Sequence, residues 1–197
     1  IYSSGTFANK QYQPEMATQL LEEAGYQTKN ADGILVNAQN EPLQIVLKTY
    51  KRLANEKIAT ALQQQFKQLG IDLKIDIQEK VDGLNQLDYD IALASALTLP
   101  TGDPHYFLAA TLSSDGALNY VKNADSWLDE KISTLGHEVD SGKIRSEVTE
   151  IQDYARDEAV VDYIGFVNLH GAMNNYIHHF ELSPSDFYHI TNKLVKD

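Results

Sequence analysis

Apolar residues recur at helical spacing in several stretches of the chain. In the first stretch Pro14 stands where a first helical residue is favoured, and Gly25 can end the helix in the left-handed conformation. Gly70 and Gly136 follow two further periodic stretches as stop signals. The spacing therefore predicts helices over residues 14–24, 55–69, 127–135 and 144–158.

The segments around these helices carry strand patterns. Residues 43–50 are rich in β-branched side chains, and residues 71–77 alternate between apolar and polar positions, which is typical of a strand with one wet face. Residues 89–96 form an apolar run, as a strand covered on both faces would. This order of elements predicts an α/β fold, with a mixed or parallel sheet and flanking helices. Further strands are predicted over residues 159–167 and 176–182, and a short helix after Ser183.

Composition changes this picture mainly through charge. The chain has 16 Lys and Arg residues against 28 Asp and Glu residues, and the net charge of −12 disfavours nucleic acid and anionic membrane surfaces as partners. There is no cysteine, which excludes disulfides and thiolate metal sites. No run approaches the roughly 18 apolar residues of a membrane span. Because the chain begins at Ile1 without an initiator methionine, we expect a fragment, with any export signal or lipid anchor upstream.

The sequence lacks the common motifs of catalysis. It has no glycine-rich phosphate loop, no Gly-x-Ser-x-Gly elbow and no His-Glu-x-x-His pair. The histidines remain as candidates, and a metal site needs imidazoles that converge on one point. His178 and His179 are neighbours on a predicted strand, where their side chains point to opposite faces, so they make a poor pair of ligands. His105, beside a strand-to-helix turn, and His170, after an apolar run, are the histidines that could line a pocket.

The turn from Leu99 to Leu108 joins the apolar run to the next helix and is the predicted ligand site. Ligands of open α/β sheets gather at the carboxyl ends of the strands. Asp103 is expected to cap the helix that begins at Pro104, a role favoured over contact with a ligand. Tyr106 and Phe107 are core residues, ligand platforms or one of each, because adjacent helical positions face different directions. The candidate ligand residues are Leu99, Pro100, Thr101, Asp103, His105 and Tyr106.

The order of the motifs resembles that of a known family. Residues 12–26 match the segment Y-x-P-E-x-A-x-x-L-L-x-E-A-G-Y of extracellular solute-binding proteins of the peptide/nickel ABC importer family (family 5). The loop with Asp32-Gly33, the helix end at residues 68–73, the strand at 89–93 and the run Gly102-Asp103-Pro104 are similar to the same family and follow in its order. The resemblance covers nearly the whole chain.

This resemblance implies the C-terminal portion of a two-lobed periplasmic-binding-protein-like fold (class II, cluster C), built as a mixed sheet with flanking helices. Residues 1–163 would form the C-terminal lobe. Residues 164–197 would form a hinge return strand and a tail that packs on the absent N-terminal lobe, with the hinge strand near residues 163–167. The two lobes would enclose the ligand by a hinge motion.

The ligand class is implied by a departure from the family pattern. Members that hold the free amino terminus of a peptide resemble one another in an aspartate four positions before the proline of the corner motif, which pairs with the ammonium group. This chain has Pro100 at that position. The run Asp103-Pro104-His105 is similar to nickel-binding members, as is the closing stretch of residues 182–188. A chelator supplies most of the metal ligands in that group, so His105 and His170 are the candidate metal ligands.

The resemblance implies a non-enzymatic substrate-binding component of an ABC importer, which captures a short peptide or a nickel chelate and delivers it to the membrane permease. Nickel would be a transported ligand, and no cofactor is expected. The expected location is extracellular, on the cell surface through a lipid anchor, or periplasmic. Two alternatives stay open: a catalytic α/β domain acting on a cationic or neutral small substrate, and a peptide-pheromone or chaperone-like protein that binds extended peptides through backbone contacts.

Overall fold

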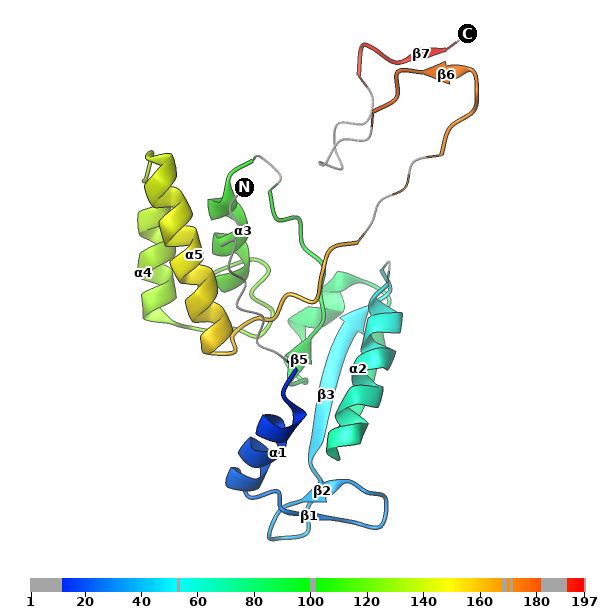
Figure 1. Cartoon of the computed structure of the whole chain (residues 1–197), viewed down its shortest axis with the longest axis vertical. Coiled ribbons are helices and arrows are strands. Elements are labelled where there is room, and N and C mark those ends of the chain that lie inside the picture. The colour runs from blue at the N-terminus through cyan, green and yellow to red at the C-terminus, as the bar shows by residue number, and fades with distance from the viewer. Residues whose placement is uncertain are drawn as a thin grey trace.

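A parallel sheet forms the centre of the first half of the chain (Figure 1). The computed structural model describes residues 12–52, 54–99, 102–167, 170, 172–181 and 191–196. The strands β4 (Asp72–Gln78), β3 (Gln44–Tyr50) and β5 (Ile91–Ala92) lie side by side in that order. Their parallel pairing confirms the sheet that the order of elements predicted.

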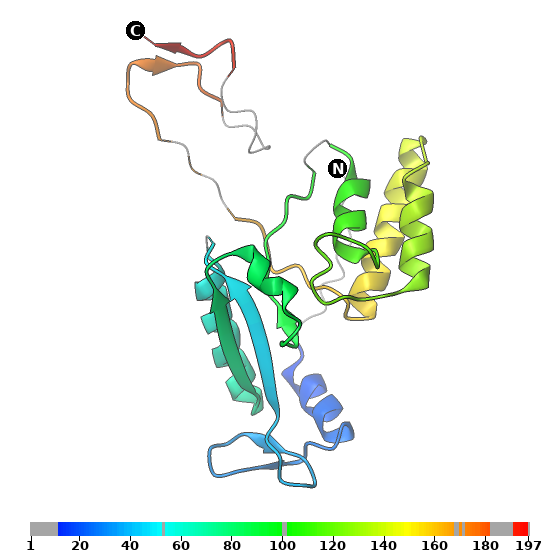
Figure 2. The same cartoon turned by 180° about the vertical axis from the view of Figure 1, so that it is seen from behind.

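One face of this sheet is covered by helix α2 (Asn55–Leu69) (Figure 2). Leu47, Leu73 and Leu93 point from the three-stranded region toward Ala59 of the helix and form a buried core with it. The helix ends at Gly70, whose φ of 88° is the left-handed conformation that suits glycine. The predicted helix over residues 55–69 is therefore confirmed in both its bounds and its stop signal.

A helix and a short hairpin precede the sheet. They are α1 (Pro14–Glu23), β1 (Thr28–Lys29) and β2 (Leu35–Val36), and the two strands pair antiparallel. Pro14 is the first residue of α1, and Gly25 has a φ of 95°, as the sequence predicted. No residue of α1 is buried. We call residues 12–93 the α/β unit.

The second half of the described chain is a three-helix packing unit. Its helices are α3 (Pro104–Leu112), α4 (Ser126–Leu135) and α5 (Ser141–Asp157), and we call residues 104–158 the helical unit. Its core is separate from that of the α/β unit and is built from Phe107, Leu108, Leu112, Leu128, Ile132, Leu135, Val148, Ile151 and Ala155. Asp125 caps α4 and also accepts a hydrogen bond from Tyr154 Oη of α5 at 2.8 Å. The helices predicted over 127–135 and 144–158 are confirmed, each beginning slightly earlier.

The strand predicted over residues 89–96 is much shorter than the apolar run. Only Ile91 and Ala92 pair in the sheet, and Ala94 and Ala96 are exposed. In the described chain β5 pairs with β3 alone at the edge of the sheet, and both of its residues are only half-buried. The prediction of a strand buried on both faces is therefore wrong, because the chain leaves the sheet soon after Leu93.

The polar face of β4 is also less exposed to solvent than the alternation of apolar and polar residues predicted. The 3₁₀ turn η1 (Val81–Asn85) packs over the sheet on the side away from α2. Asp76 of β4 lies there with its carboxylate 3.3 Å from Lys48 Nζ, and only 1% of the Lys48 side chain is exposed. This ion pair gives one of the alternating carboxylates a structural role that the pattern did not indicate.

Two further strand predictions are wrong in extent. Residues 159–167 contain no strand: Ala159 turns the chain with a φ of 55°, and residues 162–167 are exposed without a neighbouring strand. In the last region β6 (Ile177–His178) pairs antiparallel with β7 (Val195–Lys196), and these strands lie apart from both units (Figure 1). His179 has a φ of 58°, so the strand ends before it and the two histidines do not share one strand. The predicted helix after Ser183 lies outside the described residues.

Candidate functional site

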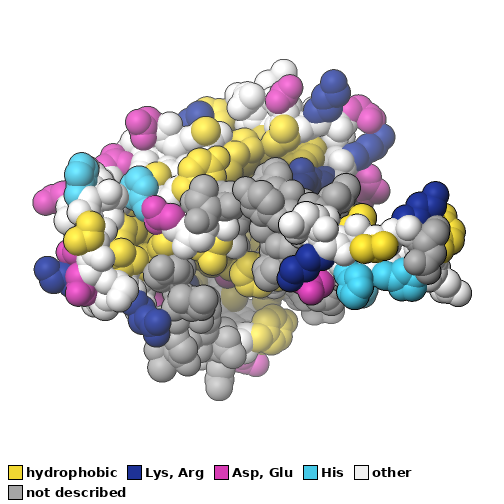
Figure 3. Space-filling view, turned by 90° about the horizontal axis from the view of Figure 1, so that it is seen from above, with side chains coloured by type: hydrophobic (Ala, Val, Ile, Leu, Met, Phe, Trp, Pro, Cys, Tyr) yellow, Lys and Arg dark blue, Asp and Glu magenta, His cyan; other side chains and the backbone are white. Residues whose placement is uncertain are grey.

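The predicted ligand corner connects the two units. Residues 94–99 lead away from the sheet, and α3 begins at Pro104 on the far side of the turn. Leu99 and Tyr106 are exposed, with 41% and 56% of their surfaces accessible. Figure 3 shows apolar side chains gathered across the middle of the face seen from above, with charged side chains mostly toward its margin. Of the predicted site residues, Pro100 and Thr101 lie outside the described part of the chain.

Asp103 has the capping role that the sequence favoured. Its backbone is extended, and its Oδ1 accepts a hydrogen bond from the backbone N–H of His105 at 2.9 Å. That N–H is one of the donors at the start of a helix that have no partner within the helix. Asp103 therefore holds the first turn of α3, and with it Tyr106, in place.

Replacing this cap should weaken the helix start. We expect Asp103→Ala to lower the free energy of unfolding by about 1 kcal/mol, because the His105 N–H loses its acceptor. Urea denaturation of the full-length protein measures the change, and Asp103→Asn, which keeps an acceptor oxygen, should lose less. Equal losses in the two variants would contradict the capping role.

The first turn of α3 sends three neighbouring side chains in different directions. The His105 ring packs against α4, where its Nε2 would lie 2.7 Å from a Cβ at Gly136. Tyr106 faces solvent, and Phe107 is buried in the core of the helical unit. Of the alternatives left open for the aromatic pair, Phe107 is thus the core residue and Tyr106 the exposed one.

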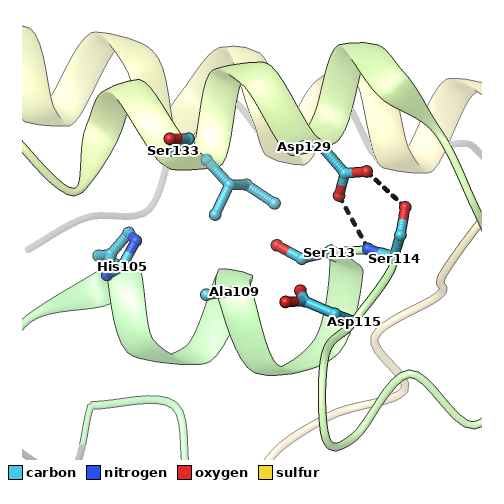
Figure 4. A pocket seen from close by; sticks show the side chains of 8 residues that line it. His105, Ala109, Ser113, Ser114, Asp115, Asp129 and Ser133 are labelled. Atoms are coloured by element: carbon cyan, nitrogen blue, oxygen red, sulfur yellow. Dashed lines mark hydrogen bonds between the residues drawn. The ribbon is translucent and has the colours of Figure 1, made fainter.

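His105 lines a shallow groove between α3 and α4 (Figure 4). The groove has a volume of about 340 Å³ and is lined by His105, Ala109, Ser113, Ser114, Asp115, Asp129, Ile132 and Ser133. The Asp129 carboxylate is already engaged, because it accepts hydrogen bonds from the Ser114 backbone N–H at 2.8 Å and from the Ser114 hydroxyl. The other polar side chains that line the groove are the His105 ring, the Asp115 carboxylate and the hydroxyls of Ser113 and Ser133.

The groove does not bring the two predicted metal ligands together. His170 is exposed and is not among the residues that line it. Within the described part of the chain, no group of three or more His, Cys, Asp or Glu side chains is placed to hold a metal ion. The assignment of His105 and His170 to a metal stays a prediction.

Tyr163 also lies at the corner, although the sequence predicted it only as the start of a hinge strand. Its ring lies 6.0 Å from that of Phe107, centroid to centroid, so the segment after α5 returns to the start of α3. Although 40% of the Tyr163 surface stays accessible, the partial cover of its phenol raises the pKa of that group to about 12. A contact between residues so far apart in the chain leaves no local pattern, so no sequence signal could have found it.

The Tyr163 phenol should therefore titrate late. In the unfolded chain it loses its proton near its ordinary pKa of 10.0, and in the folded protein near pH 12. The stabilisation from the neutral phenol is complete below pH 10 and is lost as the pH rises toward 12. The difference in tyrosinate absorbance between the full-length protein and Tyr163→Phe isolates this group, and a transition near pH 10 would contradict the shielding of its phenol from water.

None of the helices in the described ranges is both long and apolar enough to cross a membrane.

Comparison with known proteins places the chain among the solute-binding proteins. Residues 2–119 match the model of the bacterial extracellular solute-binding proteins, family 5 Middle. The chain belongs to this family, which confirms the resemblance that the motifs carried.

Two curated relatives are named for different ligands, one for nickel and the other for oligopeptides. The chain is 27% identical over 177 residues to the nickel-binding protein NikA of Staphylococcus aureus, covering 88% of this chain and 34% of the relative. It is 28% identical over 188 residues to the oligopeptide-binding protein AppA of Bacillus subtilis, covering 91% of this chain and 34% of the relative. The chain thus spans about a third of the length of the curated relatives it matches.

Solved structures agree with the predicted fold. A nickel ABC transporter protein of Bacillus halodurans matches with a TM-score of 0.69 and 28% identity, over 92% of this chain and 38% of its own. NikA of Staphylococcus aureus in complex with Ni(L-His)2 matches with a TM-score of 0.73 and 25% identity, over 94% of this chain and 38% of its own. The α/β architecture is therefore that of a portion of a family 5 solute-binding protein.

Proposed function

We propose that this chain supplies one wall of the ligand cleft in the substrate-binding component of an ABC importer, and that the ligand is a nickel chelate or a short peptide. The observation that carries this proposal is the family match over residues 2–119. The nickel-binding and oligopeptide-binding relatives support both ligand classes. The partner would be the membrane permease, and the protein would be extracellular, held by a lipid anchor or free in a periplasm.

The exposed corner supports this role for the first part of the chain. Tyr106 offers exposed aromatic surface on the capped first turn of α3, and Leu99 offers exposed apolar surface before that helix, as binding sites commonly do. Pro100 stands where a carboxylate would pair with the ammonium group of a peptide, which favours a chelate over a peptide held by its amino terminus. His105 and His170 are proposed as the protein's metal ligands.

The exposed apolar residues after α5 support a second lobe. Ile164, Phe166, Val167 and Met173 are exposed in a segment that belongs to neither unit. Soluble proteins seldom leave so many large apolar side chains in water without a partner surface. We propose that residues 1–163 carry the C-terminal lobe and that residues 164–197 form the hinge return and a tail packed on the other lobe.

Native mass spectrometry of the full-length protein tests the ligand class. The protein is measured as purified, after addition of nickel with L-histidine, and after addition of a peptide mixture. We expect a mass shift that depends on nickel and histidine together, and its loss or reduction in His105→Ala or His170→Ala. Retention of peptides without any nickel-dependent mass shift would exclude a nickel chelate as the ligand and favour a short peptide.

Recovery of the bound molecule tests the transport role against catalysis. A receptor releases its ligand unaltered and in stoichiometric amount, whereas an enzyme converts it. We expect unaltered ligand after repeated cycles of binding and release. Turnover of the added ligand by the full-length protein would overturn the proposed function.

A further inference from the structure

A buried lysine lies on the face of the sheet away from α2. Lys48 Nζ donates a hydrogen bond to the Asp88 carboxylate and lies 3.3 Å from Asp76. The same Nζ stands 5.3 Å from the centroid of the Tyr89 ring. The bond to Asp88 raises the pKa of Lys48, so the ammonium group stays charged. Two carboxylates and an aromatic face thus hold one cation, which fixes the Tyr89 ring against the sheet.

The Tyr89 hydroxyl reaches across to the helical unit. Tyr89 Oη lies 2.7 Å from the carbonyl oxygen of Leu84, in η1, and 2.8 Å from that of Tyr120, in the loop after α3. A phenol has one proton to donate, so the two carbonyls share it. Partial burial raises the pKa of Tyr120, and the neighbouring Tyr50 and Tyr89 raise it further, so the Tyr120 side chain also lies near the α/β unit.

The Tyr120 carbonyl is tied firmly to α3. Asn119 is buried, and its Nδ2 donates to the carbonyl oxygens of Ser113 at 3.0 Å and Asn123 at 2.7 Å. The backbone N–H of Leu118 donates to the carbonyl oxygen of Ala110 in α3 at 2.7 Å. These hydrogen bonds fasten the loop that carries the Tyr120 carbonyl to the C-terminal end of α3.

The loop backbone packs closely on α3 at Gly116. A Cβ at Gly116 would stand 2.5 Å from the carbonyl oxygen of Ala110, so a side chain has no room there. A continuous series of contacts thus leads from the sheet through Tyr89 to the loop and on to α3.

We propose that Tyr89 is a positioning residue: its hydroxyl sets the helical unit, and with it the exposed Tyr106 of the proposed cleft wall, at a defined position relative to the sheet. The covalent link between the units is the stretch of residues 94–103, and the units have separate cores. The hydroxyl therefore has more influence on their relative position than a hydrogen bond within one core would have. The consequence for binding rests on the proposed function, whereas the consequence for geometry does not.

Spin labels measure the geometry directly. Gln64 on α2 and Ser146 on α5 are exposed, and the chain has no cysteine, so Gln64→Cys and Ser146→Cys provide labelling sites within it. Electron–electron double resonance on the full-length protein gives the distribution of distances between the two units. We expect Tyr89→Phe to broaden this distribution. An unchanged distribution would overturn the proposal.

Tyr154→Phe is the matched control. It also removes one phenol hydroxyl, whose 2.8 Å bond to Asp125 lies within the helical unit. Both variants should lower the midpoint of thermal unfolding, and Tyr154→Phe at least as much as Tyr89→Phe, because the acceptor of Tyr154 is a carboxylate. Only Tyr89→Phe should broaden the distances, so equal broadening in both variants would show general loosening and overturn the proposal.

Ligand affinity, measured with nickel and L-histidine or with the peptide retained by the protein, is the second readout. Tyr89→Phe should weaken binding about two- to tenfold, which is the change in dissociation constant that corresponds to the loss of one hydrogen bond. Tyr154→Phe should leave the affinity unchanged. Broadened distances with unchanged affinity would overturn the positioning of the cleft wall. If the unaltered protein binds neither probe, the proposed function fails, and the distance distribution alone still decides what Tyr89 does.

Discussion

Leu108→Ala should lower the free energy of unfolding by about 2–5 kcal/mol, because it leaves a cavity in the core of the helical unit. Leu108 has 0% of its surface exposed and packs among Leu112, Leu128 and Ile151. It belongs to α3, the helix that begins at the predicted ligand corner. Urea denaturation of the full-length protein, followed by circular dichroism, measures the loss.

Leu20→Ala provides the matched control for this truncation. Leu20 lies on α1 with 57% of its surface exposed, and α1 has no buried residue. The same change of side chain should alter the free energy of unfolding there by no more than about 0.5 kcal/mol. Comparable losses at Leu20 and Leu108 would contradict the separate helical core.

Tyr106→Ala is expected to weaken ligand binding about tenfold or more while leaving stability nearly unchanged. The exposed ring stands at the start of α3, where the Asp103 cap holds the backbone in place. An aromatic side chain presented on a rigid element is the kind of residue whose truncation costs more than 1 kcal/mol in binding. Titration calorimetry of the full-length protein with nickel and L-histidine, or with a bound peptide, measures the change.

Tyr12→Ala is the control for that experiment. Tyr12 is also an exposed tyrosine, but it lies just before α1 in the α/β unit. Its loss should change neither affinity nor stability measurably. If Tyr106→Ala binds as tightly as Tyr12→Ala, the corner is not part of the cleft wall.

The helix starts and stops could be read from local residues. Pro14 and Pro104 each occupy a first helical position, Asp103 caps the second of these helices, and Gly25 and Gly70 are left-handed. These signals act within a few residues of where they stand, so they do not depend on the rest of the fold. The same holds for the order of elements, from which the parallel sheet followed.

Strand lengths could not be read in this way. The run after Tyr89 and the run after Ala159 have similar apolar character, yet the first contains only a short edge strand and the second none. A strand needs a partner to satisfy its backbone groups, and the partner is set by contacts far away in the chain. Apolar composition alone therefore overestimated both strands.

The features of the candidate site likewise fall into those set by local residues and those set by long-range packing. The start of α3 and the Asp103 cap followed from local residues, and the family followed from the resemblance of motifs in their order along the chain. The direction of His105 toward Gly136, the pairing of Phe107 with Tyr163 and the placement of Tyr89 between two units were settled by packing. Each of these contacts joins segments that are distant in the sequence, and only the folded chain brings them within reach of one another.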